Sequence, residues 1–197
     1  QALAASGLLN PQIGGPSVFP YQPDGVWAMP YSDDKWVMST NGQQYRRGLY
    51  TFARRSFPYA AFAIFDAPSR EVCTERRPRT NTPLQALVTL NDPAFFAAAG
   101  GLARRMATEG GAQDPQRLAF GFKAVLARAP SERELAVTLE LLGQARARFA
   151  ADPAAAERLL AQAALTEDRA GISPADLAAW TVVANVLLNL DEALTKG

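Results

Sequence analysis

The sequence predicts a mainly α fold, in which an α-helical bundle over residues 82–197 follows an irregular segment over residues 1–81 that wraps onto it. The later part carries repeated helix-start signals followed by apolar residues at helical spacing. The earlier part is dense in proline, glycine and single aromatic residues. A chain of 197 residues, 48% of them hydrophobic, can bury a core. We therefore expect one cooperative domain, which we interpret as a C-terminal fragment of a longer protein.

Residues 1–81 hold few regular elements. The opening "QALAASGLLN" is typical of a helix already under way, and the next residues contain too many helix breakers for a long helix. An aromatic ring buries enough area to fix a loop without a regular hydrogen-bond ladder. We therefore expect the aromatic side chains of this stretch to act as anchors: Phe19, Tyr21, Trp27, Tyr31 and Trp36.

One or two short helices are predicted in the same segment. One begins near Gln43, with Tyr45, Leu49 and Phe52 on a common face. The stretch "YAAFAIFDAP" forms a second short helix or an extended segment that ends at Asp66, because Pro68 limits its continuation.

The bundle is predicted from a recurring N-cap pattern. In "TPLQ", Thr82 is the N-cap, Pro83 the first helical residue and Gln85 the residue that reaches back to the cap. The same reasoning places further N-caps at Asp92, Asp114, Ser131, Asp152 and Ser173. Two apolar stripes follow, one over Leu135, Leu139, Leu142 and Phe149, and one over Leu177, Trp180, Ala184, Leu187 and Leu194. The helix around Trp180 is apolar nearly all round, so we expect it to be central.

Composition excludes several classes of site. The chain has no histidine and one cysteine, so it supplies no imidazole-ligated zinc, no Ser-His or Cys-His dyad, no C-x-x-C-H haem attachment and no internal disulfide. We expect no cofactor, no metal and no transmembrane segment in this chain. Nucleic-acid binding is not expected either, because the pI is only about 8.1 and no recognised module accompanies the basic residues.

Several stretches together carry a family resemblance: "GLLNPQIGGPSVFPYQPDGVW", "YRRGLYTFARRSFPYAAFAIFDAPSREVCTERRPRTNTPLQALVTLNDPAF", "RAPSEREL" and "AAWTVVANVLLNLDE". In order and spacing the chain resembles the planctomycete C-terminal domain of unknown function found in large secreted proteins that often carry a cytochrome-c-like region upstream. The resemblance implies an extracytoplasmic location, periplasmic or secreted, and partner domains within the same protein. Any haem would belong to the upstream region. The family supplies no catalytic residues to carry over.

The stretch "CTERRPRTNTPLQAL" is the candidate functional region. Residues 43–80 hold eight arginines against three acids. On one interpretation, the arginines and the Thr82 helix start bind an anion while nearby carboxylates do acid/base chemistry. On the other, which we favour, the arginines pair with those carboxylates and with backbone carbonyls as a partly buried structural clamp. The candidate catalytic residues are Asp66, Glu71 and Glu75, and the anion-binding candidates are Arg70, Arg76, Arg77, Arg79 and Thr82.

Three other features have a structural interpretation that we prefer to a functional one. We expect Cys73 to be a buried inert thiol, since free cysteine is often buried, although a link to another domain stays open. Asp33 and Asp34 are expected in a solvated turn rather than a calcium loop. Asn185 and Asn189 are expected to be satisfied by hydrogen bonds inside the bundle.

Two functions follow. The first is a noncatalytic binding or scaffolding module of a large exported multidomain protein, which packs on a partner domain and contacts an anionic polysaccharide. The alternative is a polysaccharide hydrolase or lyase, in which loop carboxylates act as acid and base and arginines hold an acidic or sulfated substrate.

Overall fold

The computed structural model describes residues 1–27, 35–54, 57–69, 71–78, 80–165 and 169–195. Within these ranges the chain is mainly α-helical, as predicted, and its only β structure is two isolated bridges. The chain divides into two compact units. Residues 1–8 and 86–197 form the helical unit, and residues 9–85 form the irregular unit. The expected wrapping and single cooperative domain remain predictions.

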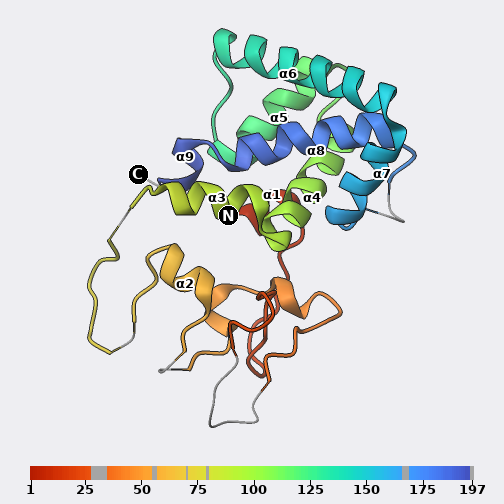
Figure 1. Cartoon of the computed structure of the whole chain (residues 1–197). Helices are drawn as coiled ribbons and strands as arrows, with labels where there is room; N and C mark the ends of the chain where they lie inside the picture. Colours follow the sequence, from red (N-terminus) through yellow and green to blue (C-terminus); the bar gives the residue numbers. More distant parts are fainter. Residues whose placement is uncertain (28–34, 55–56, 70, 79, 166–168, 196–197) are drawn as a thin grey trace. The chain divides into compact units, whose positions relative to one another are not determined.

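Helices with one apolar face pack around a central helix in the helical unit (Figure 1). The central helix is α8 (Pro174–Leu188), which packs against α4 (Pro93–Glu109), α5 (Asp114–Leu126), α6 (Glu132–Ala151) and α7 (Pro153–Gln162). Short helices complete the unit: α1 (Ala2–Ser6) contacts α4 and α5, and α9 (Asp191–Leu194) contacts α5 and α8. α3 (Pro83–Asn91) begins in the irregular unit and continues into the helical unit.

The predicted central position of the Trp180 helix is confirmed. Trp180 is fully buried, and so are Leu177, Ala184 and Leu187 of the same stripe. On α6, Leu142 and Phe149 are buried while Leu135 and Leu139 pack at the margin of the core. A helix that is apolar on all sides has no solvent face to offer, which is why α8 lies inside the others.

Small residues allow close approach between α1 and α4. A Cβ added to Gly101 would lie 2.9 Å from the carbonyl oxygen of Ser6. Arg105, one turn further along α4, donates from Nη1 to the carbonyl oxygen of Ala5 at 2.7 Å. The amino-terminal residues are therefore part of the helical unit.

Most predicted N-caps are confirmed. Asp92, Ser131, Asp152 and Ser173 each accept a backbone N–H bond at the start of a helix. The prediction for Asp114 is wrong, because the cap residue is Gln113 and its N–H donates to Oε1 of Gln116 at 3.2 Å. The Asp114 carboxylate instead accepts from the Arg146 guanidinium of α6. A long-range ion pair has replaced the local cap.

Thr82 caps α3 as predicted. The amide of Gln85 donates to Oγ1 of Thr82 at 3.2 Å, and the amide of Thr82 donates to Oε1 of Gln85 at 3.3 Å, which completes a capping box. Thr82→Ala is expected to lower the free energy of unfolding by about 1 kcal/mol, the usual loss for an N-cap. Chemical denaturation measures it. Thr40→Ala, at an exposed threonine, is the control, and an equal effect of the two variants would contradict the cap assignment.

The helix predicted from Gln43 is wrong. The segment forms two single-turn 3₁₀ helices, η1 (Gln43–Tyr45) and η2 (Gly48–Tyr50), with extended backbone around them. Its backbone pairs with the preceding loop: Val18 donates to the carbonyl of Tyr50 and Phe52 donates to that of Val18, both at 2.8 Å. These tertiary bonds override the local helical pattern. The later stretch does form a helix, α2 (Ala60–Ile64).

Aromatic rings hold the irregular unit together, as predicted for Phe19, Trp27 and Trp36. Trp36 lies 5.0 Å from both Phe19 and Trp27 between ring centroids, and it stacks on Tyr59 at 5.6 Å. The polar end of Trp36 bonds internally, since its Nε1 donates to the carbonyl of Pro20 at 2.8 Å. The cluster is a small core. Tyr31 lies outside the described residues, and no ring contact of Tyr21 is seen within them.

No helix in the described part of the chain is by itself long and apolar enough to cross a membrane. α3 and α4 reach the required length and composition only as a pair, bent by 63° where they join.

Candidate functional site

The candidate region is the loop between α2 and α3, residues 66–80, drawn in yellow in Figure 1. Asp66 closes its base. Its Oδ2 accepts from the amide of Thr80 at 3.0 Å and from the Thr80 hydroxyl at 2.8 Å. Asp66 has φ 56°, a left-handed conformation that aspartate tolerates better than most residues. The two ends of the loop are thus joined by one carboxylate.

Arg77 folds back onto the end of α2. Its Nε donates to the carbonyl oxygen of Asp66 at 3.0 Å, and its Nη2 donates to that of Phe65 at 2.7 Å. Carbonyls at a helix C-terminus lack intrahelical partners and carry partial negative charge, so a guanidinium is a favourable partner. Arg77 therefore bonds to backbone carbonyls, one of the two partner types that the clamp interpretation named.

Gln85, which is buried, connects the loop to both helices. Its Nε2 donates to the carbonyl of Ile64, the last residue of α2, and to the hydroxyl of Thr80, both at 2.9 Å. The same amide lies 3.4 Å from Oδ2 of Asp66. Because Gln85 also completes the Thr82 capping box, the helix start and the loop base form one hydrogen-bonded assembly.

The tip of the loop differs from its base. Residues 71–78 are all exposed, so the expected partial burial is wrong for Arg76 and Arg77, whereas Asp66 at the base is half-buried. The base bonds are local and hold the two loop ends, which leaves the tip in solvent. Glu71 has one such bond, from its amide to Oγ of Ser69 at 3.3 Å, and Glu75 and Arg76 are exposed. Arg70 and Arg79 lie outside the described residues, so their predicted pairing with carboxylates or carbonyls remains a prediction.

The base bonds decide the chemistry of Asp66. The hydrogen bond from the Thr80 hydroxyl is the largest cause that lowers the pKa of the Asp66 carboxyl from its ordinary 3.8. Burial opposes it, and the Thr80 amide, Gln85 and the nearby Arg77 charge lower the pKa further. A general acid needs its pKa raised toward the working pH. The shift of Asp66 runs the other way, so this carboxylate suits an anchor better than an acid catalyst.

Acid is expected to open the base of the loop. A carboxyl whose folded pKa is lowered contributes stability that is present above its ordinary value of 3.8 and is lost as the pH falls below it, through the lowered folded pKa. Exchange of the Thr80 amide hydrogen, corrected for the intrinsic pH dependence of exchange, measures this opening. Asp66→Asn should remove the pH dependence. Unchanged protection of Thr80 well below pH 3.8 would contradict the anchor role.

Arg46 is an important residue that the sequence reasoning missed. It is 3% exposed, and its guanidinium donates to the carbonyl oxygens of Gln12, Gly14 and Pro16 at 2.9, 2.6 and 3.4 Å. The guanidinium carbon also lies 3.8 Å from the centroid of the Tyr50 ring. Gly14 has φ 78°, which lets the loop turn its carbonyls inward. The one available signal was the charge-free stretch of residues 1–23, whose many carbonyls need a donor.

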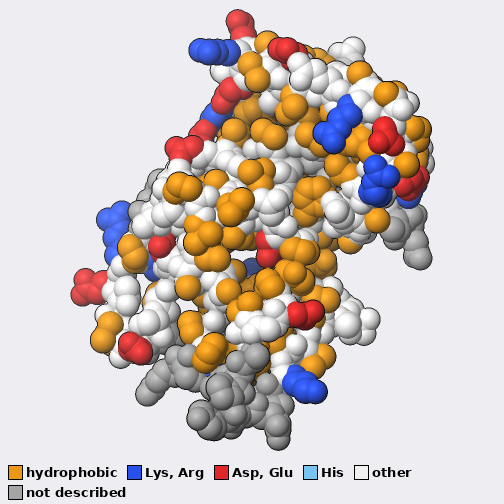
Figure 2. Space-filling model, viewed as in Figure 1, with side chains coloured by type: hydrophobic (Ala, Val, Ile, Leu, Met, Phe, Trp, Pro, Cys, Tyr) orange, Lys and Arg blue, Asp and Glu red, His pale blue; other side chains and the backbone are white. Residues whose placement is uncertain are grey.

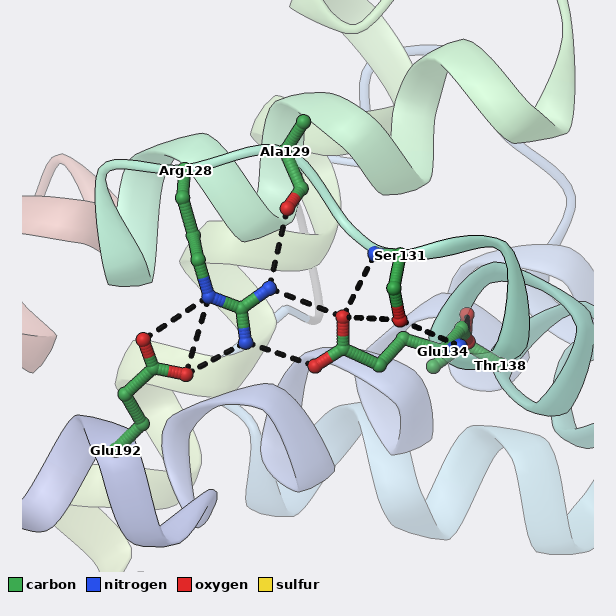
Figure 3. Close-up of polar contacts among 6 residues, drawn as sticks. All are labelled: Arg128, Ala129, Ser131, Glu134, Thr138 and Glu192. Carbon is green, nitrogen blue, oxygen red and sulfur yellow. Dashed lines mark hydrogen bonds and ion pairs between the residues drawn. The ribbon is translucent and has the colours of Figure 1, made fainter.

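A second unpredicted network lies in the helical unit (Figure 3). Arg128 donates from Nη2 to Oε1 of Glu134 at 2.8 Å and from Nε to Oε1 of Glu192 at 2.9 Å. Glu134 also accepts from the amide and hydroxyl of Ser131, at 2.7 and 2.8 Å. Arg128 and Ser131 lower the pKa of Glu134 to about 2. All partners are internal, so the network ties the α5–α6 connection to α9 rather than forming a reactive site.

The predictions for the cysteine and for the two asparagines have different outcomes. Cys73 is exposed, so its predicted burial is wrong, because it lies at the solvated tip of the loop. The expected satisfaction of the two asparagines is confirmed: Asn185 donates to the carbonyl of Thr89 at 3.5 Å, and Asn189 accepts from the Thr89 hydroxyl. Asp33 and Asp34 lie outside the described residues. Among those that are described, no three Cys, Asp or Glu side chains group as metal ligands.

Comparison with known proteins gives one family. A family model described as PSD1, protein of unknown function (DUF1553), matches residues 1–142. No curated protein and no solved structure matches the chain.

Proposed function

The chain belongs to the PSD1 family (DUF1553) of proteins of unknown function, and on that premise we propose that it is a noncatalytic binding module of a larger exported protein. In this proposal the module packs on a partner domain and presents an arginine-bearing loop to an anionic polysaccharide. The larger protein is planctomycete, lies outside the cytoplasm and carries an upstream cytochrome-c-like region, which would hold any haem.

The construction of the 66–80 loop supports this proposal. Its polar bonds gather at the base, where Asp66 holds Thr80 and Arg77 holds the end of α2. Its tip is exposed. A loop fixed at both ends presents its tip side chains with less freedom to lose on binding, which favours recognition.

The composition of the tip supports an anionic ligand. Arg76 is exposed, and no hydrogen bond or ion pair of its side chain is seen within the described part of the chain. A guanidinium matches sulfate and carboxylate groups through parallel N–H bonds, and polysaccharides that carry such groups present them repeatedly. Binding through one exposed arginine is weak and becomes useful when repeated along a polymer.

The catalytic alternative has less support. A hydrolase or lyase of this kind needs an acid and a base that are free to exchange protons with the substrate. Asp66 has its carboxylate in the loop base and its pKa lowered, and Glu71 and Glu75 lie in the solvated tip rather than in a water-excluding pocket. We therefore favour binding over turnover.

Arg76→Ala is expected to weaken binding of a sulfated polysaccharide about tenfold, the loss of one charge-assisted contact. Its melting temperature should be unchanged, because the side chain is exposed. Arg47→Ala, which removes another exposed arginine of the same unit, is the matched control and should bind almost normally. Affinity is measured by calorimetry over a series of salt concentrations, since exposed contacts are screened by salt. Equal weakening by both variants would show binding by net charge alone and contradict the proposal.

A further inference from the structure

α3 is amphipathic in the reverse sense to an ordinary surface helix. Its buried residues are polar, since Gln85 and Thr89 are only 2% and 1% exposed. Its leucines face solvent, with Leu84, Leu87 and Leu90 exposed by 53%, 58% and 39%. At about 100° per residue, the three leucines span about a third of the helix circumference, and the centre of that arc lies opposite Gln85 and Thr89. Figure 2 shows apolar side chains at the surface where Figure 1 places this helix.

The polar side of α3 cannot turn outward without breaking bonds. Gln85 donates to the carbonyl of Ile64 and to the Thr80 hydroxyl. Thr89 donates to the side chain of Asn189, and its carbonyl accepts from Asn185. Rolling the helix to hide its leucines would leave these buried polar groups without partners. The leucine face is therefore held in its exposed orientation.

The absence of charge on this face indicates what kind of surface it binds. The nine residues "PLQALVTLN" carry no charge. A helix that lies on an anionic membrane normally carries lysine or arginine on its polar face, and α3 has neither. An uncharged apolar face is matched by an uncharged apolar protein surface, where no charge is stranded on either side.

The small size of this face favours a partner that is covalently linked to the chain. Nine helical residues span about 14 Å, so one such face buries only a few hundred Å². A stable complex between separate molecules needs about 1,000 Å² or more, which this face alone does not supply to a second copy of the chain. A small contact suffices when the partner is covalently linked, because the effective concentration is then high.

From these observations we infer that the α3 leucine face, Leu84, Leu87 and Leu90, docks on an uncharged apolar surface of another domain of the same polypeptide. The inference rests on the proposed function in so far as that function places the chain within a larger protein. It assigns the packing surface, whereas the 66–80 loop is the ligand-contacting surface.

The test measures the accessibility of α3 in the chain alone and in the natural full-length polypeptide. Cys73→Ser removes the exposed native thiol of this chain, and Leu87→Cys or Val137→Cys then introduces one. Leu87 and Val137 are both 58% exposed, so they form a matched pair on different helices. Each introduced cysteine is quantified by maleimide labelling followed by peptide mass analysis.

In the chain alone, both introduced cysteines should label at similar rates. In the full-length polypeptide, labelling at position 87 should slow by about tenfold or more, while labelling at position 137 should not change. Equal rates at position 87 in the two proteins would overturn the inference. So would slowing in the chain alone, either with rising protein concentration, which would indicate a second copy, or with phosphatidylserine vesicles, which would indicate a membrane.

The experiments distinguish a failure of the docking inference from a failure of the glycan-binding proposal. Leu87→Asp in the chain alone should leave affinity for the sulfated polysaccharide unchanged, because Leu87 lies outside the 66–80 loop. Loss of glycan binding in Arg76→Ala tests the loop, and protection of position 87 tests the docking face.

Discussion

Replacing Trp180 by alanine is expected to lower the free energy of unfolding of the helical unit by about 3 to 5 kcal/mol, the usual range for truncating a fully buried tryptophan. Trp180 lies on α8, which packs against α4, α5, α6 and α7, so the cavity cannot close by movement of one neighbour. The Arg146 guanidinium lies 5.6 Å from the indole ring centroid and would lose that contact as well. Denaturant titration followed by far-UV circular dichroism measures the loss.

Trp180→Phe is the control for this prediction. It keeps most of the apolar volume and removes the Nε1 donor, which is buried and has no partner in the described part of the chain. Its cost should therefore be clearly smaller than that of alanine. Equal costs for the two variants, or a loss below 1 kcal/mol for alanine, would show that α8 is not the centre of the core.

Replacing Arg46 by alanine is expected to cost about 3 kcal/mol or more in the irregular unit. The variant removes donors to the carbonyls of Gln12, Gly14 and Pro16 from a buried position, and hydrogen bonds to charged groups contribute about 1.5 to 3 kcal/mol each before relaxation. Arg46→Lys should recover only part of the loss, since an ammonium lacks the planar fork that reaches several carbonyls.

Arg47→Ala is the matched control for Arg46. Arg47 is the next residue and is exposed, so its removal should change stability by no more than about 0.5 kcal/mol. Both variants are measured in a Trp180→Phe background. The remaining tryptophans, Trp27 and Trp36, lie in the irregular unit, so tryptophan fluorescence then reports the unfolding of that unit. Equal stabilities of the Arg46 and Arg47 variants would contradict the role assigned to the buried guanidinium.

The sequence predicted those parts of the fold that depend on neighbouring residues. Thr82 and Gln85 form a capping box within four residues, so their pattern is informative by itself. The position of Trp180 follows from a helix with no polar side to expose. In both cases the physical cause lies within one helix.

The failures share a different cause, which is dependence on distant partners. The segment from Gln43 has a helical pattern, but its backbone bonds to residues about 30 positions earlier. Asp114 follows the same Asp-Pro pattern as Asp92, yet its carboxylate is taken by Arg146, 32 residues away. Local patterns contain no information on such partners.

The location of the candidate site remains a prediction; the predicted bonding to backbone carbonyls is seen for Arg77, but its predicted partial burial is wrong. Arg77 bonds in solvent to the carbonyls at the end of α2, and Asp66 bonds to Thr80. Cys73 shows the limit of arguing from residue type, since free cysteine is usually buried and this one is exposed. Which face of α3 is buried could not be predicted, because leucine outside and glutamine inside reverses the usual rule.

We propose that the 66–80 loop binds an anionic polysaccharide without transforming it. Binding and turnover measured on the same sulfated polysaccharide, by calorimetry and by assay of new chain ends, test it most directly. We expect salt-sensitive binding that weakens in Arg76→Ala, with no new polysaccharide ends over long incubation. If the unmodified protein formed new polysaccharide ends and Asp66→Asn abolished their formation, the binding proposal would be contradicted and the hydrolase or lyase alternative established.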